Sequence, residues 1–287
     1  MTVDLLKIGL PKGRMERAVL ELLSDGGVRV TPSARGYRPH VRFECAEAKV
    51  LKPQNIIEML VHGSRDVGFA GADWVAELSA DLVEVLDTGL DPVRLVAAAP
   101  DELLEHHQLP LRALVVASEY ERLARRWIAE RGLDAAVVRS YGATEVFPPE
   151  DADVVVDCTA TGATLRANGL AIVDTLLHSS TRLYTSHQAW HDSARRQRIE
   201  DLALLLRSVL EARHRVMLEV NASAECLEHV VAVLPAMRQP TESPLFGNGS
   251  FAVKAAIPRD SVSSIIPALK AAGGTDVVVS TLSQIVP

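Results

Sequence analysis

The stretch VVVDCTATGATLRANGL, residues 154–170, joins a run of valines, an acid and a turn built from threonine and glycine. A continuous apolar run is typical of a strand that is buried on both faces, as in the parallel sheets of α/β proteins. The small residues that follow it indicate a tight turn into a helix. This stretch therefore predicts a strand–turn–helix unit, from which α/β folds are built.

Similar apolar runs recur along the chain, separated by segments with helical periodicity. The runs are LLKIGL (5–10), VGFAG (67–71), RLVAAA (94–99), RALVVAS (112–118) and AAVVRS (135–140). The helical segments are MERAVLELLSDGG (15–27), QNIIEMLVHGSRD (54–66) and EYERLARRWIAERG (119–132). This alternation predicts a mostly parallel sheet with helices on both faces. Ligands of such sheets bind at the carboxyl ends of strands, which is where residues 157–164 lie.

The pattern changes after residue 189. One long helical pattern over residues 189–215 leads into a strand (215–222), a helix (224–235), two strands (240–246 and 250–258), a helix (261–274) and a strand (276–286). The order βαββαβ predicts a small ferredoxin-like module. Such modules often bind small effectors, although the fold alone does not establish a function.

The composition limits the classes of protein that this chain can represent. Its 287 residues are 48% hydrophobic, which is sufficient for two or three domains. A net charge of -7 argues against a nucleic-acid or membrane-surface binder, since both need a dominant positive field. The three cysteines show no metal or disulfide spacing, and no apolar run is long enough to span a membrane. These features predict a soluble, cytoplasmic protein.

Residues 157–164 have the components of a phosphate-binding loop. The backbone can approach a ligand closely there, and Thr159, Thr161 and Thr164 add hydroxyl donors. Asp157 suits a ribose hydroxyl or a magnesium-bound water. An ordinary strand-to-helix turn with threonine caps fits the same composition. The chain lacks GxxxxGK[ST], and no strand is followed by GxGxxG, so mononucleotide kinases and Rossmann dehydrogenases lose most of their support.

Three further segments are candidates for the same kind of site. LPKGRM (10–15) places Lys12 and Arg14 at the start of a helix, VGFAGADWV (67–75) has glycines at a strand end before Asp73, and SYGATEV (140–146) carries Glu145. Cations near a helix N-terminus would favour an anion in an otherwise acidic protein. The alternatives are an exposed basic turn, close strand–helix packing and a capped helix start, respectively.

Taken together, these segments resemble ATP phosphoribosyltransferase of the long, feedback-regulated form. The resemblance extends over nearly the whole chain. It rests on LPKGRM, LKPQNIIEML, DVGFAGADWV, ADVVVDCTATGATLRANGL, SSTRLY, RRQRIEDLALLL, LPAMRQPTESPL and LKAAGGTDVVV, found in this order. It implies a two-lobed, periplasmic-binding-protein-like catalytic unit and an ACT-like regulatory domain. The implied boundaries are 1–94 for lobe I (completed by about 180–212), 95–179 for lobe II and 213–287 for the regulatory domain.

The resemblance implies an enzyme that joins ATP to phosphoribosyl pyrophosphate (PRPP) with Mg²⁺, the first step of histidine biosynthesis. The PRPP site would comprise Glu145, Asp157, Thr159, Ala160, Thr161, Gly162, Ala163 and Thr164. The residues for ATP or pyrophosphate would be Lys12, Arg14, Arg35, Lys52, Gly71 and Asp73. Lys52 stands where many relatives have arginine, so it keeps the charge without the bidentate geometry. No acid or base and no metal ligand is assigned.

The resemblance also implies a homohexamer inhibited by L-histidine, which would bind between regulatory domains of neighbouring subunits. The matching positions are Asn221, Thr241, Gly273 and Gly274; Asn221 replaces an aspartate of some relatives. Two other functions remain open. The first is a non-catalytic small-molecule sensor or solute-binding protein, which uses the same lobed fold. The second is a salvage phosphoribosyltransferase, although those enzymes usually place two adjacent acids where this chain has Asp157 and Cys158.

Overall fold

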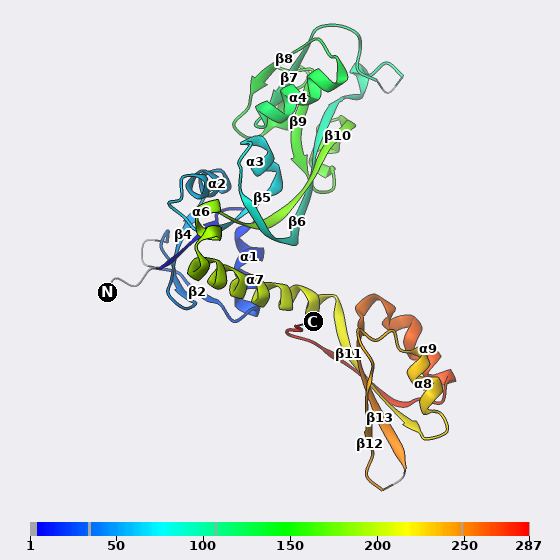
Figure 1. Cartoon of the computed structure of the whole chain (residues 1–287). Helices are drawn as coiled ribbons and strands as arrows, with labels where there is room; N and C mark the ends of the chain where they lie inside the picture. Colours follow the sequence, from blue (N-terminus) through cyan, green and yellow to red (C-terminus); the bar gives the residue numbers. More distant parts are fainter. Residues whose placement is uncertain (1–4, 34–35, 107, 248, 287) are drawn as a thin grey trace. The chain divides into compact units, whose positions relative to one another are not determined.

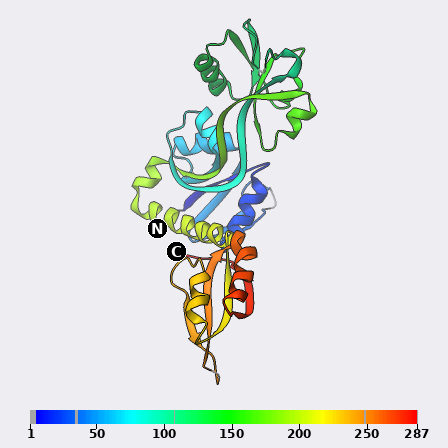
Figure 2. The ribbon, with the colours of Figure 1, turned by 90° about the vertical axis from the view of Figure 1, so that its right-hand side faces the viewer.

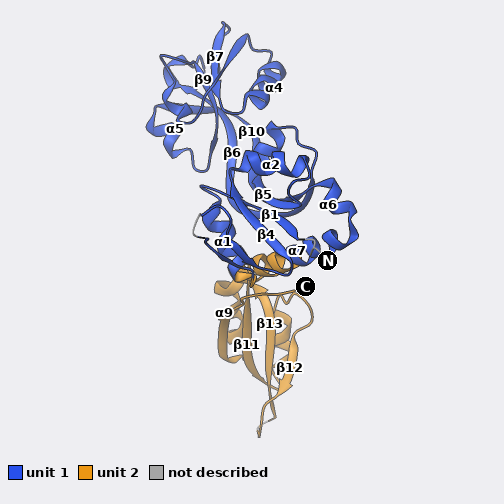
Figure 3. Cartoon of the chain, turned by 90° about the vertical axis from the view of Figure 1, so that its left-hand side faces the viewer, with its two compact units in different colours: residues 1–24, 28–203 blue, residues 25–27, 204–287 orange. Residues whose placement is uncertain are grey.

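The computed structural model describes residues 5–33, 36–106, 108–247 and 249–286. The chain divides into two compact units, coloured separately in Figure 3. Unit 1 comprises residues 1–24 and 28–203, and unit 2 comprises residues 25–27 and 204–287. The boundary falls within helix α7 (Ser193–Arg213), whereas the sequence interpretation starts the regulatory domain at residue 213, the last residue of that helix.

Unit 1 is built on an eight-stranded sheet with the order β4-β1-β5-β10-β6-β9-β7-β8. The first three strands pair in parallel, as do the last three, and the long strands β10 and β6 run antiparallel between these two groups (Figures 1 and 2). Its strands are β1 (Leu6–Pro11), β4 (Ala46–Leu51), β5 (Val67–Gly71), β6 (Val83–Pro100), β7 (Leu114–Ser118), β8 (Ala135–Arg139), β9 (Val154–Thr159) and β10 (Leu170–Thr185). A small pair, β2 (Arg29–Thr31) and β3 (His40–Arg42), lies apart from this sheet.

We call the parallel group β4-β1-β5 lobe I and the group β9-β7-β8 lobe II. The α-helices that precede α7 are α1 (Glu16–Asp25), α2 (Pro53–Val61), α3 (Ala72–Glu77), α4 (Glu121–Arg131), α5 (Ala163–Ala167) and α6 (His187–His191). The expected α/β class and two-lobed architecture are confirmed. The two antiparallel strands between the lobes were not part of the expectation of a mostly parallel sheet.

The valine run of β9 is buried because both faces of the lobe II sheet are covered. Val154 and Val156 pack into the cluster that contains Trp127 of α4, while Val155 packs into a second cluster with Leu165 of α5. Alternate side chains of a strand point to opposite faces, so a strand between two helical layers needs apolar residues at every position. This packing fixes the end of β9, and with it the start of the threonine-rich turn.

Two expectations about the elements up to α7 were wrong. Residues 189–215 do not form one helix, because Asp192 separates α6 from α7 and its Oδ1 accepts the N–H groups of Ala194 and Arg195, each at 3.0 Å. An aspartate in this position caps a new helix start. The expected strand over 94–99 is the end of a much longer one, β6, and its partner β10 was not expected as a strand at all.

Unit 2 has the expected βαββαβ order, with the sheet order β12-β13-β11-β14. Apolar side chains of β11 and β13 pack against the two helices, and this cluster includes Leu218, Val230 and Leu269. The last strand ends at Thr281, so the expected strand over 276–286 was too long. The elements are β11 (Arg215–Ser223), α8 (Leu227–Val233), β12 (Thr241–Pro244), β13 (Ser250–Pro258), α9 (Val262–Ala271) and β14 (Thr275–Thr281).

Candidate functional site

The threonine loop, residues 159–164, connects the end of β9 to α5 and is held by its own side chains. Thr159 Oγ1 accepts the N–H of Gly162 at 2.9 Å, and Thr161 Oγ1 accepts the N–H of Ala163 at 3.3 Å. Arg166 donates from Nη1 to the carbonyl oxygen of Thr161 at 3.1 Å. Gly162 has a φ of 75°, which favours glycine, so the tight turn depends on that residue.

A cavity of about 210 Å³ opens over this loop. Most of its lining is polar or small, and it includes every residue of the expected PRPP site except Gly162. The lining residues are Glu145, Asp157, Cys158, Thr159, Ala160, Thr161, Ala163, Thr164 and Leu165. Backbone and hydroxyl donors beside carboxylates suit a phosphorylated sugar, because the donors can bind the phosphate while the carboxylates accept from sugar hydroxyls.

Asp157 lines this cavity, and the pKa of its carboxyl group is raised. Burial raises its pKa to about 6, and nearby Glu145 and Glu119 act in the same direction. The N–H of Cys158, which donates to Asp157 Oδ1 at 2.6 Å, and the charge of Arg14 act the other way. Glu119, which follows β7, was missed in the sequence. The convergence of strand ends at one edge of a parallel sheet was the only signal that could have identified it.

The raised pKa of Asp157 predicts a stability cost at neutral pH. The carboxyl binds its proton more tightly in the folded protein than in the unfolded chain, so its ionisation as the pH rises destabilises the fold. Asp157→Asn is expected to increase the free energy of unfolding by as much as about 3 kcal/mol at neutral pH, with the difference vanishing below about pH 4. Urea unfolding at both pH values measures this. An equal difference at the two pH values would contradict the prediction.

Two of the expected cations follow neighbouring strands of lobe I. Pro11 of β1 is paired with Leu51 of β4, so Lys12 and Lys52 leave the sheet at the same edge. The N–H of Lys12 donates to the carbonyl oxygen of Leu51 at 2.8 Å, and Lys52 is the N-cap residue of α2. Both lysines are exposed, as an anion site requires. Arg35 lies outside the residues that the structure describes.

The turn after β1 brings a cation close to lobe II. Gly13 has a φ of 92°, and Arg14 beyond it is exposed. Arg14 is near enough to Asp157 to lower the pKa of that carboxyl, although the two residues come from different lobes. Lys12 Nζ lies 3.4 Å from Tyr37 Oη and 5.1 Å from the centroid of its ring. Tyr37 was not among the expected site residues.

Gly71 and Asp73 are buried rather than open to a ligand. Asp73 Oδ2 accepts from Tyr120 Oη at 2.6 Å, and Asp73 Oδ1 accepts from Ser179 Oγ at 2.6 Å. The Cys158 thiol lies 3.3 Å from Tyr120 Oη. A Cβ on Gly71 would collide with Asp73 Oδ1, so glycine is needed there for packing. The structure thus favours close strand–helix packing as the reason for the glycine of this segment. Through Tyr120, Asp73 is also connected to Cys158 of β9, the strand that carries Asp157.

In unit 2, three of the four expected inhibitor residues lie together. Asn221 Nδ2 donates to Asp276 Oδ2 at 3.2 Å, and a Cβ on Gly274 would lie 2.9 Å from Val220 Cγ2. Gly273 has a φ of 88° and lies beside Cys226. The fourth residue, Thr241, lies on the edge strand β12 and lines a separate cavity of about 310 Å³ with Met217, Met237 and Lys254.

The fold and site define this chain as a two-lobed α/β protein with a polar cavity over the threonine loop at the end of β9. Residues 52–208 match the family model described as ATP phosphoribosyltransferase, and residues 212–284 match the HisG C-terminal domain. The ATP phosphoribosyltransferase of Chlorobium phaeobacteroides is 36% identical over 99% of this chain and 98% of its own length. That of Pelotomaculum thermopropionicum is 36% identical over 98% and 99%, respectively.

The solved ATP phosphoribosyl transferase (HisG:HisZ) complex from Thermotoga maritima shares the fold. It aligns with a TM-score of 0.63 and 24% identity over 71% of this chain and 99% of its own. The chain therefore belongs to the ATP phosphoribosyltransferase family, the transferases of the first step of histidine biosynthesis. The expected family and enzyme class are confirmed. Among the described residues, no helix is long and apolar enough to cross a membrane.

Proposed function

We propose that the two lobes bind PRPP and ATP side by side and transfer the phosphoribosyl group to N1 of the adenine. The observation that carries this proposal is the cavity over the threonine loop of lobe II, which Asp157 and Glu145 line. Lobe I adds the exposed Lys12, Arg14 and Lys52 at the carboxyl edge of its sheet, and the charge of Arg14 lowers the pKa of Asp157. Neither half is sufficient by itself. The threonine loop of lobe II offers donors and acceptors for a sugar phosphate, and the cations of lobe I offer positive charge for a polyphosphate.

The threonine loop would bind the 5′-phosphate of PRPP. All of its residues except Gly162 line the cavity over α5, together with Asp157 and Glu145. The two carboxylates would accept hydrogen bonds from the ribose hydroxyls. A ribose anchored at both its phosphate and its hydroxyls would present C1 in a defined direction, which is the main requirement for a displacement reaction.

Lys12, Arg14 and Lys52 would bind the phosphates of ATP or the departing pyrophosphate, and Arg35 would join them. The first three are exposed at the carboxyl edge of the lobe I sheet. Asp73 would act through packing rather than by contact with a nucleotide, because both of its carboxylate oxygens are bound by side chains of this chain. Gly71 would contribute by leaving room for Asp73.

The chemistry that this site would support needs no activated nucleophile. N1 of adenine uses its lone pair to form the bond to C1 of PRPP, while the C1–O bond breaks and its electron pair leaves with pyrophosphate. Positive charge develops at C1 and negative charge at the leaving oxygens. Cations fixed around the pyrophosphate stabilise that developing charge, so positioning and electrostatics supply the rate enhancement. The reaction requires no acid or base among the residues of the site.

Mg²⁺ would enter this site with its substrate. Within the residues that the structure describes, no three His, Cys, Asp or Glu side chains are arranged to hold a metal ion. Mg²⁺ commonly binds one or two carboxylates together with substrate phosphates and keeps several waters. Asp157 and Glu145 fit this mode, because both line the cavity over the loop. The ion would supply charge neutralisation for the pyrophosphate.

L-Histidine would act as feedback inhibitor in a homohexamer. Thr241 lies two strands away from Asn221 in the sheet of unit 2 and borders a different cavity from the Gly273 turn. The two groups therefore lie apart within one chain. The separation supports a site shared between neighbouring subunits, with Asn221 and the Gly273–Gly274 turn from one and Thr241 from the other.

This regulatory assignment predicts a selective loss of inhibition. In Gly273→Ala the new Cβ would lie 2.5 Å from Cys226 Sγ, so the turn would shift. The concentration of L-histidine for half-inhibition should rise by at least about tenfold while the uninhibited rate is kept. Gly247→Ala is the matched control, because Gly247 also has a positive φ of 91° but no atom within 4 Å of a new Cβ. Equal inhibition of Gly273→Ala and wild type would contradict the assignment.

The function itself is tested with purified protein, ATP, PRPP and Mg²⁺. Phosphoribosyl-ATP should appear as an ultraviolet absorbance change, together with pyrophosphate, and L-histidine should suppress it. PRPP binding is measured in parallel by calorimetry. Binding of PRPP without product would favour a non-catalytic sensor instead. Product from free adenine or another base in place of ATP would favour a salvage transferase.

A further inference from the structure

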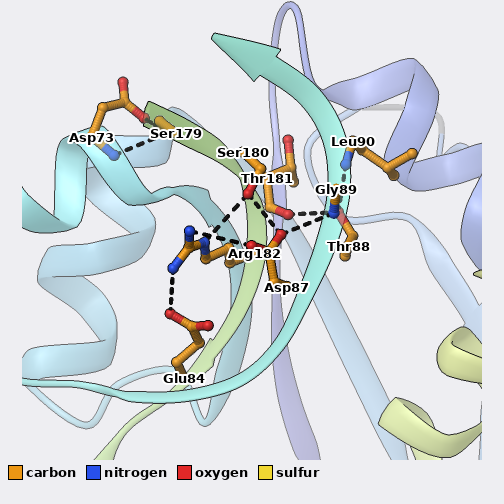
Figure 4. A network of polar contacts seen from close by, with 10 residues as sticks. All are labelled: Asp73, Glu84, Asp87, Thr88, Gly89, Leu90, Ser179, Ser180, Thr181 and Arg182. Atoms are coloured by element: carbon orange, nitrogen blue, oxygen red, sulfur yellow. Dashed lines mark hydrogen bonds and ion pairs between the residues drawn. The ribbon is translucent and has the colours of Figure 1, made fainter. Parts of the chain in front are cut away.

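The strands β6 and β10 change their pairing where they pass from one lobe to the other. β10 pairs with β5 of lobe I through residues 181–185, and β6 pairs with β9 of lobe II through residues 94–98. Between these regions the register jumps, because Ser179 faces Val93, Thr181 faces Leu90 and Arg182 faces Asp87. β6 therefore has extra residues here. We call residues 87–91 together with 179–182 the crossover bulge (Figure 4).

Side chains replace the missing backbone pairing in the crossover bulge. Thr88 Oγ1 donates to the carbonyl oxygen of Thr181 at 2.5 Å and accepts the N–H of Leu90 at 3.2 Å. Thr181 Oγ1 donates to Asp91 Oδ2 at 3.1 Å. Gly89 and Asp91 have φ values of 64° and 48°, a conformation that ordinary strands do not adopt. Bulges of this kind bend a strand and redirect the residues beyond the bend.

Asp87 is the centre of the bulge. Its Oδ1 accepts from Ser180 Oγ at 2.6 Å and from the N–H of Gly89 at 2.9 Å, and its Oδ2 lies 3.2 Å from Arg182 Nη2. Burial acts to raise the pKa of Asp87. The bonds from Ser180 and Gly89 and the charge of Arg182 outweigh it, so the pKa lies below its ordinary value. One carboxylate thus joins a loop of β6 to two residues of β10.

The bulge is also connected to the packing beneath the candidate site. Ser179 donates to Asp73 Oδ1 and accepts the N–H of Asp73 at 3.0 Å, as Figure 4 shows. Asp73 in turn accepts from Tyr120, next to the Cys158 thiol. Cys158 directly follows Asp157 in β9. A change in the bulge would therefore reach both the start of α3 and the strand that ends at the threonine loop.

We propose that Asp87 is a positioning residue that, through Ser180, Gly89 and Arg182, sets how the lobe I cations face the lobe II threonine loop. The crossover bulge is the hinge about which the two lobes move when both substrates bind. This inference rests on the proposed function, because it needs ligands on both lobes. Among the described residues, the hydrogen bonds and the ion pair of Asp87 involve none of the proposed ligand-binding residues. Its effect is therefore on the joint geometry rather than on either half-site.

This role of Asp87 predicts that its replacement lowers turnover without weakening the binding of PRPP. Asp87→Ala should leave the Kd for PRPP, which is held within lobe II, unchanged within about threefold, but lower kcat by about 10- to 100-fold because a small misplacement of reacting atoms is costly. Asp87→Asn keeps acceptors for Ser180 and Gly89 and should lose less. Glu84→Gln is the matched control, because Glu84 also pairs with Arg182, at 2.8 Å, but does not bind Ser180 or Gly89. It should behave as wild type.

Hydrogen–deuterium exchange of the full chain provides a second measurement, which does not depend on any variant folding. Adding ATP, PRPP and Mg²⁺ to the wild type should slow exchange in the threonine loop and also change it in residues 87–91. Protection of the threonine loop with no change at 87–91 would overturn the hinge assignment but leave the proposed function standing. No protection of the loop, with no product formed, would instead overturn the proposed function. A kcat for Asp87→Ala equal to that of Glu84→Gln would also refute the role of Asp87.

Discussion

Replacing Gly162 by valine is expected to raise the Kd for PRPP by about 100-fold, because losing one or two hydrogen bonds to a charged phosphate costs about 3 kcal/mol. Gly162 has a φ of 75°, and a Cβ there would lie 3.0 Å from Arg166 Nη1 and 3.5 Å from Ile172 Cδ1. A non-glycine residue in the left-handed region costs about 1–2 kcal/mol before any collision is counted. The loop would relax by moving its backbone, and the N–H groups would then miss the phosphate.

Gly169→Ala is the control for this experiment. Gly169 has a φ of 70°, so alanine there also adopts the left-handed backbone conformation, but no atom lies within 4 Å of the new Cβ and the residue does not line the cavity. Calorimetric titration with PRPP should give a nearly unchanged Kd for this variant. If Gly162→Val and Gly169→Ala weakened PRPP binding equally, general backbone strain would explain both, and the threonine loop would not be the phosphate site.

Replacing Arg14 by alanine should reduce kcat/KM by about 10²- to 10³-fold, the usual loss when one fixed group that stabilises transition-state charge is removed. Arg14 is the lobe I cation that acts on Asp157, so it lies at the junction between the two half-sites. Its removal should also raise the pKa of Asp157 further, since a favourable positive charge is lost. A carboxyl-stretch infrared titration, compared with Asp157→Asn, would show this shift without reference to catalysis.

Arg17→Ala controls for the loss of a positive charge from the same region. The Arg17 side chain is 89% exposed and pairs with Glu21 of its own helix at 2.7 Å. Its removal should change kcat/KM by less than about threefold, since exposed charges are screened. Similar losses in both variants would mean that Arg14 acts through the general field of the protein. An unchanged pKa of Asp157 in Arg14→Ala would contradict the electrostatic interaction between Arg14 and Asp157.

Local sequence signals were sufficient to predict most of the secondary structure of the catalytic unit. The valine run of β9 and the Thr–Gly turn after it could be predicted because burial on two faces and a positive φ each restrict the residues at their own positions. The βαββαβ order of unit 2 was predictable for the same reason. The family resemblance then supplied the reaction. Asp192 could have been recognised as a helix start, because an aspartate before a polar first turn is a capping signal.

Other features could not be found from the chain alone. β10 was missed because its residues Ser179–Arg182 are polar, and strand formation there depends on pairing with β6 and β5. Asp73 was expected to bind a nucleotide. Its burial depends on Tyr120 and Ser179, which lie 47 and 106 residues away in the sequence. Glu119 lies near Asp157 because β7, the strand that it follows, pairs with β9.

By itself the sequence determined most strands and helices of the lobes, although not β4 or α3, together with the threonine loop and the two cationic turns, because apolar periodicity and turn chemistry act between near neighbours. The tertiary structure alone decided that Arg14 acts on Asp157, that Asp73 packs beneath the site and that Asp87 holds the crossover bulge. The physical reason is that burial and electrostatic interaction depend on distance in space. In this fold, strands that are far apart in the sequence bring these residues together.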